Sequence, residues 1–417
     1  MNLTDVQRTP HGVRSRFAPD SVPANTSSFC GIEFSFMKAA VLSAPSSISQ
    51  SPLKIEDIPT PEPKSGHVLL KVLACGVCRT DLHIVEGELP PRKPRVVPGH
   101  QIVGEIIAGD FDGSTDRVGR LALSVAEGTF LSDREKETGG TSSHVGTGGL
   151  ARPVEQSSTK LRSELRRGTR VGVSWIGGID GTCSYCRRNM ENLCDFPTFT
   201  GYTVDGGYAE YALARANFCF PIPAQLDDVH AAPLLCAGII GFRALRVAGV
   251  EKAERVGLFG FGSSAHLAIH VLQAWKCEVY VSTRGESHRK LATELGATWV
   301  GTEDEKPPAE LDRAITFAPS GDVVIAALSS LRKGGVVAIN AIHLDCIPQF
   351  DYDRLLWGER QIRSVANMTR ADARDFLQLA AEIKLKPRVT SFPLEKANEA
   401  LMAVKRDSID GAAVIVP

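Results

Sequence analysis

An apolar strand sequence runs directly into a glycine-rich turn at Arg255-Val256-Gly257-Leu258-Phe259-Gly260-Phe261-Gly262-Ser263-Ser264-Ala265. The spacing Gly-x-Gly-x-x-Ala is a permitted form of the dinucleotide-binding fingerprint, in which the glycines allow a tight turn and a close approach to a pyrophosphate. The N–H groups at the start of the following helix would hold that pyrophosphate. The alternative is a tight strand-to-helix turn that binds nothing.

Strands and helices alternate downstream of this turn. Helical sequence lies at 264–275, 287–295 and 323–331. Strand sequence lies at 277–282, 314–317, 335–339 and 361–365. Such alternation indicates a parallel sheet covered by helices. We therefore predict a doubly wound Rossmann domain over 238–366, with Gly260, Gly262 and Ala265 at its cofactor site.

The end of the strand at 277–282 bears on the choice of cofactor. An NAD-selective site would place an acidic residue there, but the sequence continues as Ser282-Thr283-Arg284. Arginine near this point can accept the 2′-phosphate of NADP. We expect NAD(P) with a preference for NADP, bound through Thr283 and Arg284. Alternatively, Arg284 is a solvated loop charge.

The chain before this region contains short strands broken by proline and glycine. They occupy 38–42, 67–74, 101–107, 170–175 and 207–212, which is typical of a small barrel-like β unit. Helical sequence at 370–383 and 394–406 precedes a last strand at 412–416. We predict an α/β protein with a β-rich domain over 37–237, to which 367–417 returns.

Two segments lack apolar periodicity. Residues 1–36 contain no apolar core of the kind a secretory signal needs, and 110–167 is rich in glycine, serine and threonine. Such segments bury too little apolar surface to offset their ordering entropy. We expect both to be disordered, 110–167 as a flexible insertion. Alternatively, Met37 is the true start and 1–36 is an upstream extension.

Charge and cysteine content narrow the function classes. Lysine plus arginine number 47 and aspartate plus glutamate 48, a net charge of −1 that argues against a nucleic-acid partner. No apolar run approaches the roughly 20 residues of a membrane helix. Ten cysteines in 417 residues are too few for a disulfide scaffold. We therefore expect a cytoplasmic protein without a membrane or nucleic-acid partner.

Three cysteines and an aspartate gather in the pattern Asp180-x2-Cys183-x2-Cys186-x7-Cys194. This spacing is typical of a loop wrapped around one tetrahedral zinc ion, with three thiolates and a carboxylate as ligands. The carboxylate is a harder ligand than a thiolate and would weaken the affinity. Alternatively, the cysteines are unligated in a surface loop.

Further candidate ligands are dispersed over three segments. They are Cys75-Gly76-Val77-Cys78-Arg79-Thr80-Asp81-Leu82-His83, Pro98-Gly99-His100-Gln101 and Pro233-Leu234-Leu235-Cys236-Ala237-Gly238. Two thiolates and one imidazole would leave the fourth position of a catalytic zinc open. Spacing does not decide between Cys75 and Cys78. Cys75 and Cys78 could also form a redox dithiol. Cys236 could instead be a small core residue, as a lone cysteine more often is.

In this order the motifs resemble those of the zinc-dependent alcohol dehydrogenases of the medium-chain dehydrogenase/reductase superfamily, especially the bacterial propanol-preferring branch. The resemblance covers about 37–417, apart from the insertion. It implies a GroES-like catalytic domain beside the Rossmann domain, two zinc ions per chain and a dimer or tetramer. The implied reaction is the reversible oxidation of a primary, or in some cases secondary, alcohol to an aldehyde or ketone, with hydride transfer to NAD(P).

The resemblance also implies roles for single residues. It assigns the catalytic zinc to Cys78, His100 and Cys236, the structural zinc to Asp180, Cys183, Cys186 and Cys194, the proton relay to Thr80 and His83, and the orientation of His100 to Asp81. Two departures are visible. Gln101 stands where many relatives carry glutamate, and Asp180 replaces the first structural cysteine.

Two other readings stay open at this point. A metal-free quinone or enone reductase has the same architecture without the dispersed ligand set, and the cysteine loop could be the zinc ribbon of a binding protein. The neutral charge and the dinucleotide fingerprint argue against the ribbon. Metal analysis separates the three interpretations. The zinc-dependent alcohol dehydrogenase predicts two zinc ions per chain, a structural site alone predicts one, and the metal-free reductase predicts none.

Overall fold

A computed structural model describes residues 36–109, 165–409 and 411–417, and the residues from Phe36 onward form one compact unit. The predicted disordered segments, 1–36 and 110–167, lie outside the described residues except at their ends. Phe36 opens the first strand, so the predicted disorder is wrong at this residue. Leu165, at the other boundary, is buried in the hydrophobic core.

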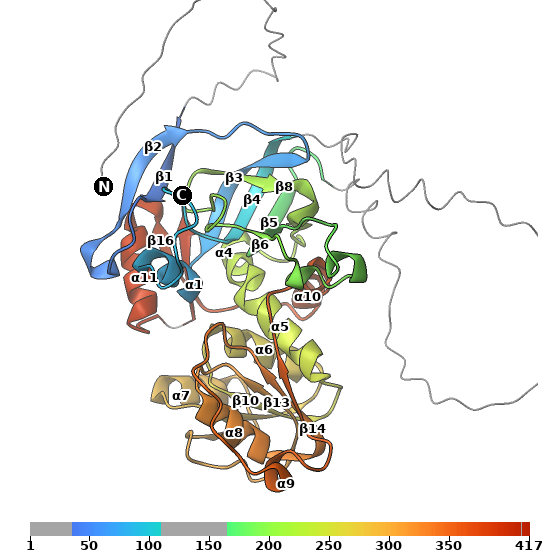
Figure 1. Ribbon diagram of the computed structural model, residues 1–417. Coiled ribbons are helices and arrows are strands. Elements are labelled where there is room, and N and C mark those ends of the chain that lie inside the picture. The colour runs from blue at the N-terminus through green and yellow to red at the C-terminus, as the bar shows by residue number, and fades with distance from the viewer. Residues whose placement is uncertain (1–35, 110–164, 410) are drawn as a thin grey trace, which may run out of the picture. The chain divides into compact units, whose positions relative to one another are not determined.

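A six-stranded parallel sheet forms from the predicted Rossmann region (Figure 1). Its strand order is β12-β11-β10-β13-β14-β15, with bounds β10 (Arg255–Phe259), β11 (Glu278–Ser282), β12 (Trp299–Gly301), β13 (Leu311–Thr316), β14 (Leu331–Ile339) and β15 (Gln361–Ser364). This is the 3-2-1-4-5-6 order of a doubly wound sheet, which reverses between β10 and β13. The predicted Rossmann fold is confirmed.

One helix precedes the first strand of this sheet and four follow between its strands. They are α5 (Ala237–Ala248), α6 (Ser263–Ala274), α7 (Glu286–Glu294), α8 (Gly321–Ser329) and the short α9 (Tyr352–Leu355). In α6 the apolar residues Leu267, Ile269, Val271 and Leu272 are buried, so helix and sheet share one core. That packing fixes the start of α6 directly after the glycine turn.

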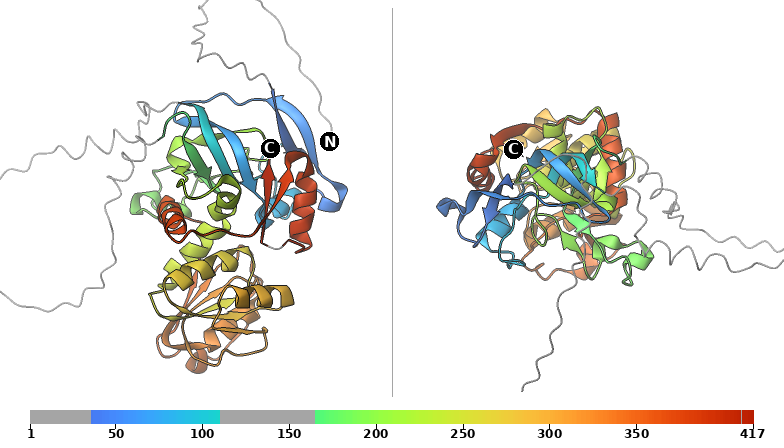
Figure 2. Two further views of the ribbon diagram at one scale, coloured as in Figure 1. Left: turned by 180° about the vertical axis from the view of Figure 1, so that it is seen from behind. Right: turned by 90° about the horizontal axis from the view of Figure 1, so that it is seen from above.

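The β-rich part contains a seven-stranded sheet with the path β16-β17-β3-β4-β5-β9, and β8 pairs with β3. The bounds are β3 (His67–Gly76), β4 (Gln101–Gly109), β5 (Arg170–Val173), β8 (Tyr211–Arg215), β9 (Cys219–Pro221), β16 (Val389–Pro393) and β17 (Ala412–Val416). Strand β17 is antiparallel to β3, with Ile415 opposite Cys75. The end of the chain therefore returns to the seven-stranded sheet of the β-rich part, as the red strands in Figure 2 show.

Smaller elements complete the described chain. The strands β1 (Phe36–Leu42) and β2 (Leu53–Pro59) form one hairpin-like pair, and β6 (Ile176–Gly178) and β7 (Thr198–Phe199) form another. The helices are α1 (Arg79–Glu86), α4 (Asp228–Ala231), α10 (Arg370–Glu382) and α11 (Ala397–Lys405). Short 3-10 turns are η1 (Ile48–Gln50), η2 (Cys186–Arg188), η3 (Glu191–Leu193), η4 (Ala216–Phe218), η5 (Ala232–Leu235) and η6 (Leu394–Lys396).

The strand predicted at 207–212 is displaced in the structure, where β8 begins only at Tyr211. The residues before it have other partners than β3: Gly207 donates to Gly99 O at 2.8 Å and Tyr208 donates to Pro98 O at 3.0 Å, whereas Ala209 forms an isolated antiparallel bridge with Ala39 of β1. The alternation of apolar residues continues through this segment, so the sequence pattern does not reveal the change of partner.

Within the described residues, no single helix is long and apolar enough to cross a membrane. Residues Asp228–Leu235 and Ala237–Ala248 meet that test of length and composition only as a pair, with a bend of 44° between them. Leu234, Leu235, Ile239 and Leu245 of this pair are fully buried in a core that contains residues of both sheets. Cys236, at the bend, is half-buried next to this core.

Candidate metal centres and cofactor site

The structure brings Cys78, His100 and Cys236 together. Their ligand atoms all lie within 4.8 Å of one another, and His100 Nε2 is 3.3 Å from Cys236 Sγ. The three residues come from the start of α1, the residue before β4 and the residue before α5. Cys75 lies outside this group, buried in β3 beside Gly99 and Gly207. The geometry thus selects Cys78 over Cys75, which the spacing alone did not decide.

The local structure of α1 fixes Cys78. Its sulfur accepts the N–H of Thr80 at 3.5 Å, and its own N–H donates to Asp81 Oδ2 at 2.9 Å. These two bonds form a capping box with cysteine in the N-cap position. The capping box holds the Sγ atom of Cys78 at the N-terminus of α1, where it faces the other two candidate ligands.

Asp81 organises the neighbouring groups. It is fully buried; its Oδ1 contacts His100 Nδ1 at 2.9 Å, and its Oδ2 accepts the hydroxyl of Tyr208 at 3.0 Å. Because Nδ1 of His100 is engaged, Nε2 faces the two thiols, as expected for a metal ligand oriented by a carboxylate. The ring of Trp175 also meets His100 edge-on, with centroids 5.1 Å apart.

The electrostatics of this cluster favour a cation. Burial is the largest single effect and works against the charged form of His100, but the charges and hydrogen bonds of Asp81 and Cys78 together outweigh it and raise the pKa of His100 to about 10. Hydrogen bonding from Cys236 and then His100 holds the pKa of Cys78 well below its usual value, despite burial. The bond to Cys78 and burial raise the pKa of Cys236. Two thiolates and an imidazole suit Zn²⁺, which would displace the protons, so the residues fit this metal.

Cys75 has the opposite environment. Burial, followed by the charge of Asp81, raises the pKa of its thiol well above the usual value. Reactive cysteines need an accessible thiolate, so this position favours a packing role over half of a redox dithiol.

The second candidate centre contains Asp180, Cys183, Cys186 and Cys194, whose ligand atoms also lie within 4.8 Å of one another. The Oδ1 of Asp180 accepts the N–H groups of Cys183 at 3.1 Å and Thr182 at 2.8 Å. These bonds lower the pKa of Asp180 to about 2, so its carboxylate is charged at neutral pH. Four protein ligands without an open position fit a structural zinc ion.

The glycine turn has the shape of a dinucleotide cradle. Gly260 has φ +90°, and a Cβ there would lie 2.9 Å from the backbone N of Ala318. A Cβ on Gly262 would meet open space, and no described side chain caps the start of α6. Ala265 is fully buried behind the turn. The free N–H groups of the first helical turn and the space in front of them fit a pyrophosphate.

Thr283 and Arg284 follow β11, close to this turn. Thr283 is buried, and its carbonyl accepts a bond from Arg289 at 3.2 Å. The side chain of Arg284 is 78% exposed, with its Nε 3.4 Å from Glu303 Oε2. The sequence reading missed Glu303, because it belongs to the loop after the next strand and only the parallel sheet brings it beside Arg284.

The two proposed relay residues have different neighbours. Thr80 is buried, with its hydroxyl 3.6 Å from Cys78 Sγ, whereas His83 lies one turn along α1 and pairs through Nδ1 with Glu88. Tyr208 and Trp175 were not predicted as site residues. Neither carries a sequence signal, since their part in the site depends on contacts with Asp81 and His100 that the fold creates.

The fold, the glycine cradle and the two ligand clusters together define a medium-chain dehydrogenase. The family described as "Alcohol dehydrogenase GroES-like domain" matches residues 64–161 and 152–224, and that described as "Zinc-binding dehydrogenase" matches 265–382. A probable alcohol dehydrogenase of Mycobacterium tuberculosis is 40% identical over 380 residues, covering 91% of this chain and 97% of the relative. The chain belongs to the zinc-type alcohol dehydrogenases of the medium-chain dehydrogenase/reductase superfamily.

Solved structures have the same fold. A cobalt- and zinc-bound alcohol dehydrogenase from Pyrobaculum aerophilum has a TM-score of 0.70 at 22% identity, covering 92% of this chain and 100% of its own. An acetophenone reductase from Geotrichum candidum, in complex with NAD, has a TM-score of 0.70 at 24% identity, covering 93% and 99%. The predicted α/β architecture with a GroES-like and a Rossmann part is confirmed.

Alcohol dehydrogenase activity is therefore the function of this chain, with a small-molecule alcohol as substrate. The predicted activity is confirmed, and the metal-free quinone or enone reductase is not favoured.

Proposed function

We propose that each chain binds two zinc ions: a catalytic one at Cys78, His100 and Cys236 and a structural one at Asp180, Cys183, Cys186 and Cys194. The observation that carries the first assignment is the convergence of three ligand atoms within 4.8 Å, one of them aimed by the Asp81–His100 contact at 2.9 Å. When bound, the catalytic zinc would lower the pKa of the substrate hydroxyl, and the nicotinamide would accept the hydride.

The chain's own residues orient the reactants and remove the proton. Asp81 holds the imidazole of His100, and Tyr208 and the Cys78 N–H share the charge of that carboxylate. In the proposed relay the hydroxyl of Thr80, beside Cys78, accepts the proton of the substrate hydroxyl while it releases its own proton toward His83, whose imidazole takes up that proton and delivers it to solvent. Since Glu88 occupies Nδ1 of His83, the relay uses Nε2.

The relay can be tested with His83→Gln. We expect its kcat/KM to fall on the order of tenfold to a hundredfold near neutral pH, because a general base is removed. The deficit should shrink at high pH, where solvent hydroxide accepts the proton. Full pH–rate profiles of the wild type and the variant measure this. Glu88→Gln, which keeps the imidazole, serves as the control and should retain more activity.

Two outcomes would contradict the relay. A loss of activity of the same size at every pH would show that His83 is a structural residue. A wild-type pH–rate profile in His83→Gln would exclude both a relay role and a structural role for His83.

We also propose that NADP is the preferred cofactor. The end of β11 carries Thr283 and Arg284 in place of an acid, which supports a site for the 2′-phosphate. The contact between Arg284 and Glu303 neutralises part of this positive charge. The preference should therefore depend on both residues.

Arg284→Ala is expected to raise the KM for NADP much more than that for NAD. The loss is about 1.5–3 kcal/mol if a charge-assisted hydrogen bond is removed. Glu303→Gln is the matched control, expected to shift the preference further toward NADP, because it frees the guanidinium and removes a repulsive charge. Steady-state kinetics with both cofactors decide the matter. A wild-type preference for NAD that Arg284→Ala leaves unchanged would refute the proposal.

We propose finally that the enzyme is a cytoplasmic homodimer or homotetramer. The family resemblance supports an oligomer, as does the exposure of Ile342, Tyr352 and Trp357 in one stretch of the chain. Free thiols at both metal centres are consistent with a reducing compartment. Sedimentation should give two or four times the 44.9 kDa mass of the chain, and a monomer would contradict this assignment.

A further inference from the structure

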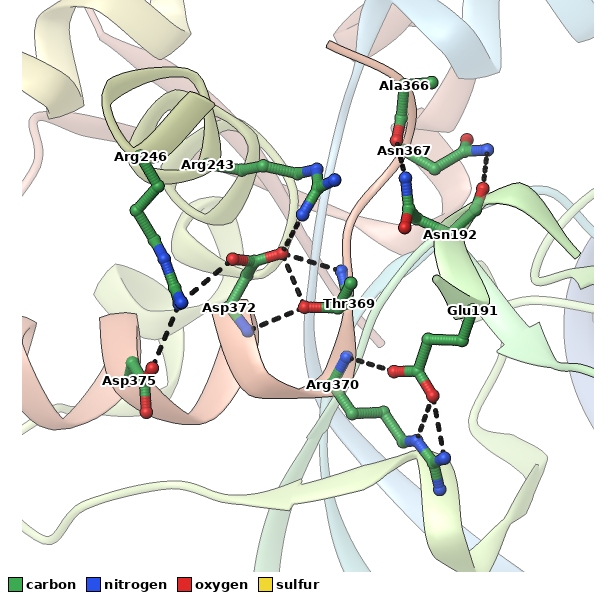
Figure 3. Close-up of polar contacts among 10 residues, drawn as sticks. All are labelled: Glu191, Asn192, Arg243, Arg246, Ala366, Asn367, Thr369, Arg370, Asp372 and Asp375. Atoms are coloured by element: carbon green, nitrogen blue, oxygen red, sulfur yellow. Dashed lines mark hydrogen bonds and ion pairs between the residues drawn. The ribbon is translucent and has the colours of Figure 1, made fainter. Parts of the chain in front are cut away.

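A polar network ties the cysteine loop to the first turn of α10 (Figure 3). The backbone N–H of Arg370 donates to Glu191 Oε1 at 2.6 Å, and its guanidinium donates twice to Oε2, at 2.9 and 2.7 Å. Next to it, Asn192 Nδ2 donates to Ala366 O and Asn367 Nδ2 donates to Asn192 O, both at 2.9 Å. Two adjacent residues of the loop therefore hold the segment that leads into α10.

Glu191 is in turn held by a proposed metal ligand. Its carbonyl accepts the N–H of Cys194 at 3.1 Å, and the sulfur of Cys194 accepts the N–H of Asp180 at 3.4 Å. A metal ion that fixes Cys194 therefore also fixes the backbone of Glu191.

The connection continues from α10 to α5. Asp372 is buried; its Oδ2 is 2.7 Å from Arg243 Nη1, and its Oδ1 is 3.2 Å from Arg246 Nη1, both on α5. The same carboxylate accepts the N–H of Thr369 at 2.9 Å, completing a capping box at the start of α10. Breaking such a buried pair leaves a charge without a partner, which is strongly unfavourable. The first turn of α10 and helix α5 should therefore move together.

Phe376 carries the connection to the catalytic cluster. Its ring is fully buried, and a Cβ built on Gly238 would lie only 2.4 Å from the ring atom Cε1. The ring thus packs directly on the backbone of the first turn of α5. Cys236 immediately precedes this turn, and its carbonyl accepts the N–H of Ile240 at 2.9 Å. Phe376 therefore links α10 to the helical turn that directly follows Cys236.

We propose that Glu191 is a positioning residue that couples the two metal centres, so that metal in the cysteine loop stabilises Cys236 as a ligand. This inference rests on the proposed zinc ligands. Coupling between binding sites is reciprocal, and networks of packed and paired side chains carry it. Loss of Glu191 should therefore weaken metal retention at a centre that it does not touch.

The test uses the full chain with zinc in the cysteine loop and Co²⁺ at Cys78, His100 and Cys236. Loss of Co²⁺ to excess chelator is followed by its thiolate absorption band, which also reports the geometry of the site. In Glu191→Ala we expect loss about threefold to thirtyfold faster than in the wild type, together with a shifted band. Glu191→Gln keeps one acceptor oxygen, so its rate of Co²⁺ loss should lie between those of the wild type and Glu191→Ala.

The matched control is Glu254→Ala. Glu254 forms a comparably shielded ion pair with Arg313 at 3.1 Å, the two side chains being 14% and 15% exposed, against 12% and 26% for Glu191 and Arg370. It precedes β10 and belongs to no part of the network. Its variant should release Co²⁺ at the wild-type rate.

Two results would overturn the coupling: a wild-type rate in Glu191→Ala, or equal acceleration in Glu254→Ala, which would indicate general loosening. If Glu191→Ala does not fold, Arg370→Gln applies the same test, since it removes the ion pair with Glu191 but keeps the backbone bond; a wild-type rate there would also overturn the coupling. A wild-type protein without a thiolate band would refute the proposed catalytic ligands as well, so the two failures are distinguishable.

Discussion

Replacing Cys78 or Cys236 with alanine should abolish alcohol oxidation while the chain stays folded and binds its cofactor. Each substitution removes one of three ligand atoms that lie within 4.8 Å of one another, leaving too few for a stable open zinc site. A Lewis acid contributes several kcal/mol of transition-state stabilisation, so kcat/KM should fall about a thousandfold or more. Steady-state kinetics and metal analysis measure the two effects together.

Cys75→Ala is the matched control for this prediction. Cys75 is a buried cysteine three residues before the half-buried Cys78, but it lies outside the ligand cluster. Its variant should keep its metal and its activity, with at most a modest loss of stability. Normal turnover with unchanged metal content in Cys78→Ala or Cys236→Ala would refute the assignment of the catalytic ligands.

Replacing Cys186 should act on stability, because a closed metal site contributes folding free energy directly. We expect Cys186→Ala to lower the free energy of unfolding by roughly 4 kcal/mol or more, the range in which loss of a metal falls. Thermal unfolding with and without chelator measures the effect: chelator should lower the melting temperature of the wild type but barely change that of the variant.

Cys346→Ala serves as the control, because Cys346 is exposed and lies outside both clusters. It should unfold as the wild type does and keep the response to chelator. An unchanged melting temperature in Cys186→Ala would show that the loop holds no stabilising metal.

The parts of the structure that follow from local sequence could be predicted. The turn at Gly260 and Gly262 lies between β10 and α6 as expected, because an apolar strand, a glycine turn and an amphipathic helix are all encoded within about twenty residues. The last strand was predicted with its observed bounds, Ala412–Val416, because a continuous apolar run is typical of a buried strand. The cysteine loop was equally visible, since its ligands are close in sequence.

The remaining features depend on contacts between distant residues. Spacing does not decide between Cys75 and Cys78 as a ligand. The family resemblance favours Cys78, and the capping box of α1 and the position of His100 give the physical reason. Tyr208 is an ordinary aromatic residue until the fold brings its hydroxyl to Asp81, 127 positions earlier in the chain. No periodicity or spacing encodes such a contact, because partner choice is decided by tertiary packing.

The contact between Glu191 and Arg370 belongs to the same class, with 179 positions between the two residues. Each alone looks like a surface charge. Their pairing becomes visible only when β15 has ended and the chain has turned into α10 beside the cysteine loop (Figure 3).

Counting the zinc ions per chain tests the central claim most directly. Metal analysis of the purified wild type, Cys78→Ala and Cys186→Ala after dialysis should give two ions in the wild type. Cys78→Ala should retain one ion, held by the cysteine loop, and Cys186→Ala should show reduced zinc content with lower stability. A wild-type chain that holds one ion or none, or a Cys78→Ala variant that still holds two, would contradict the account.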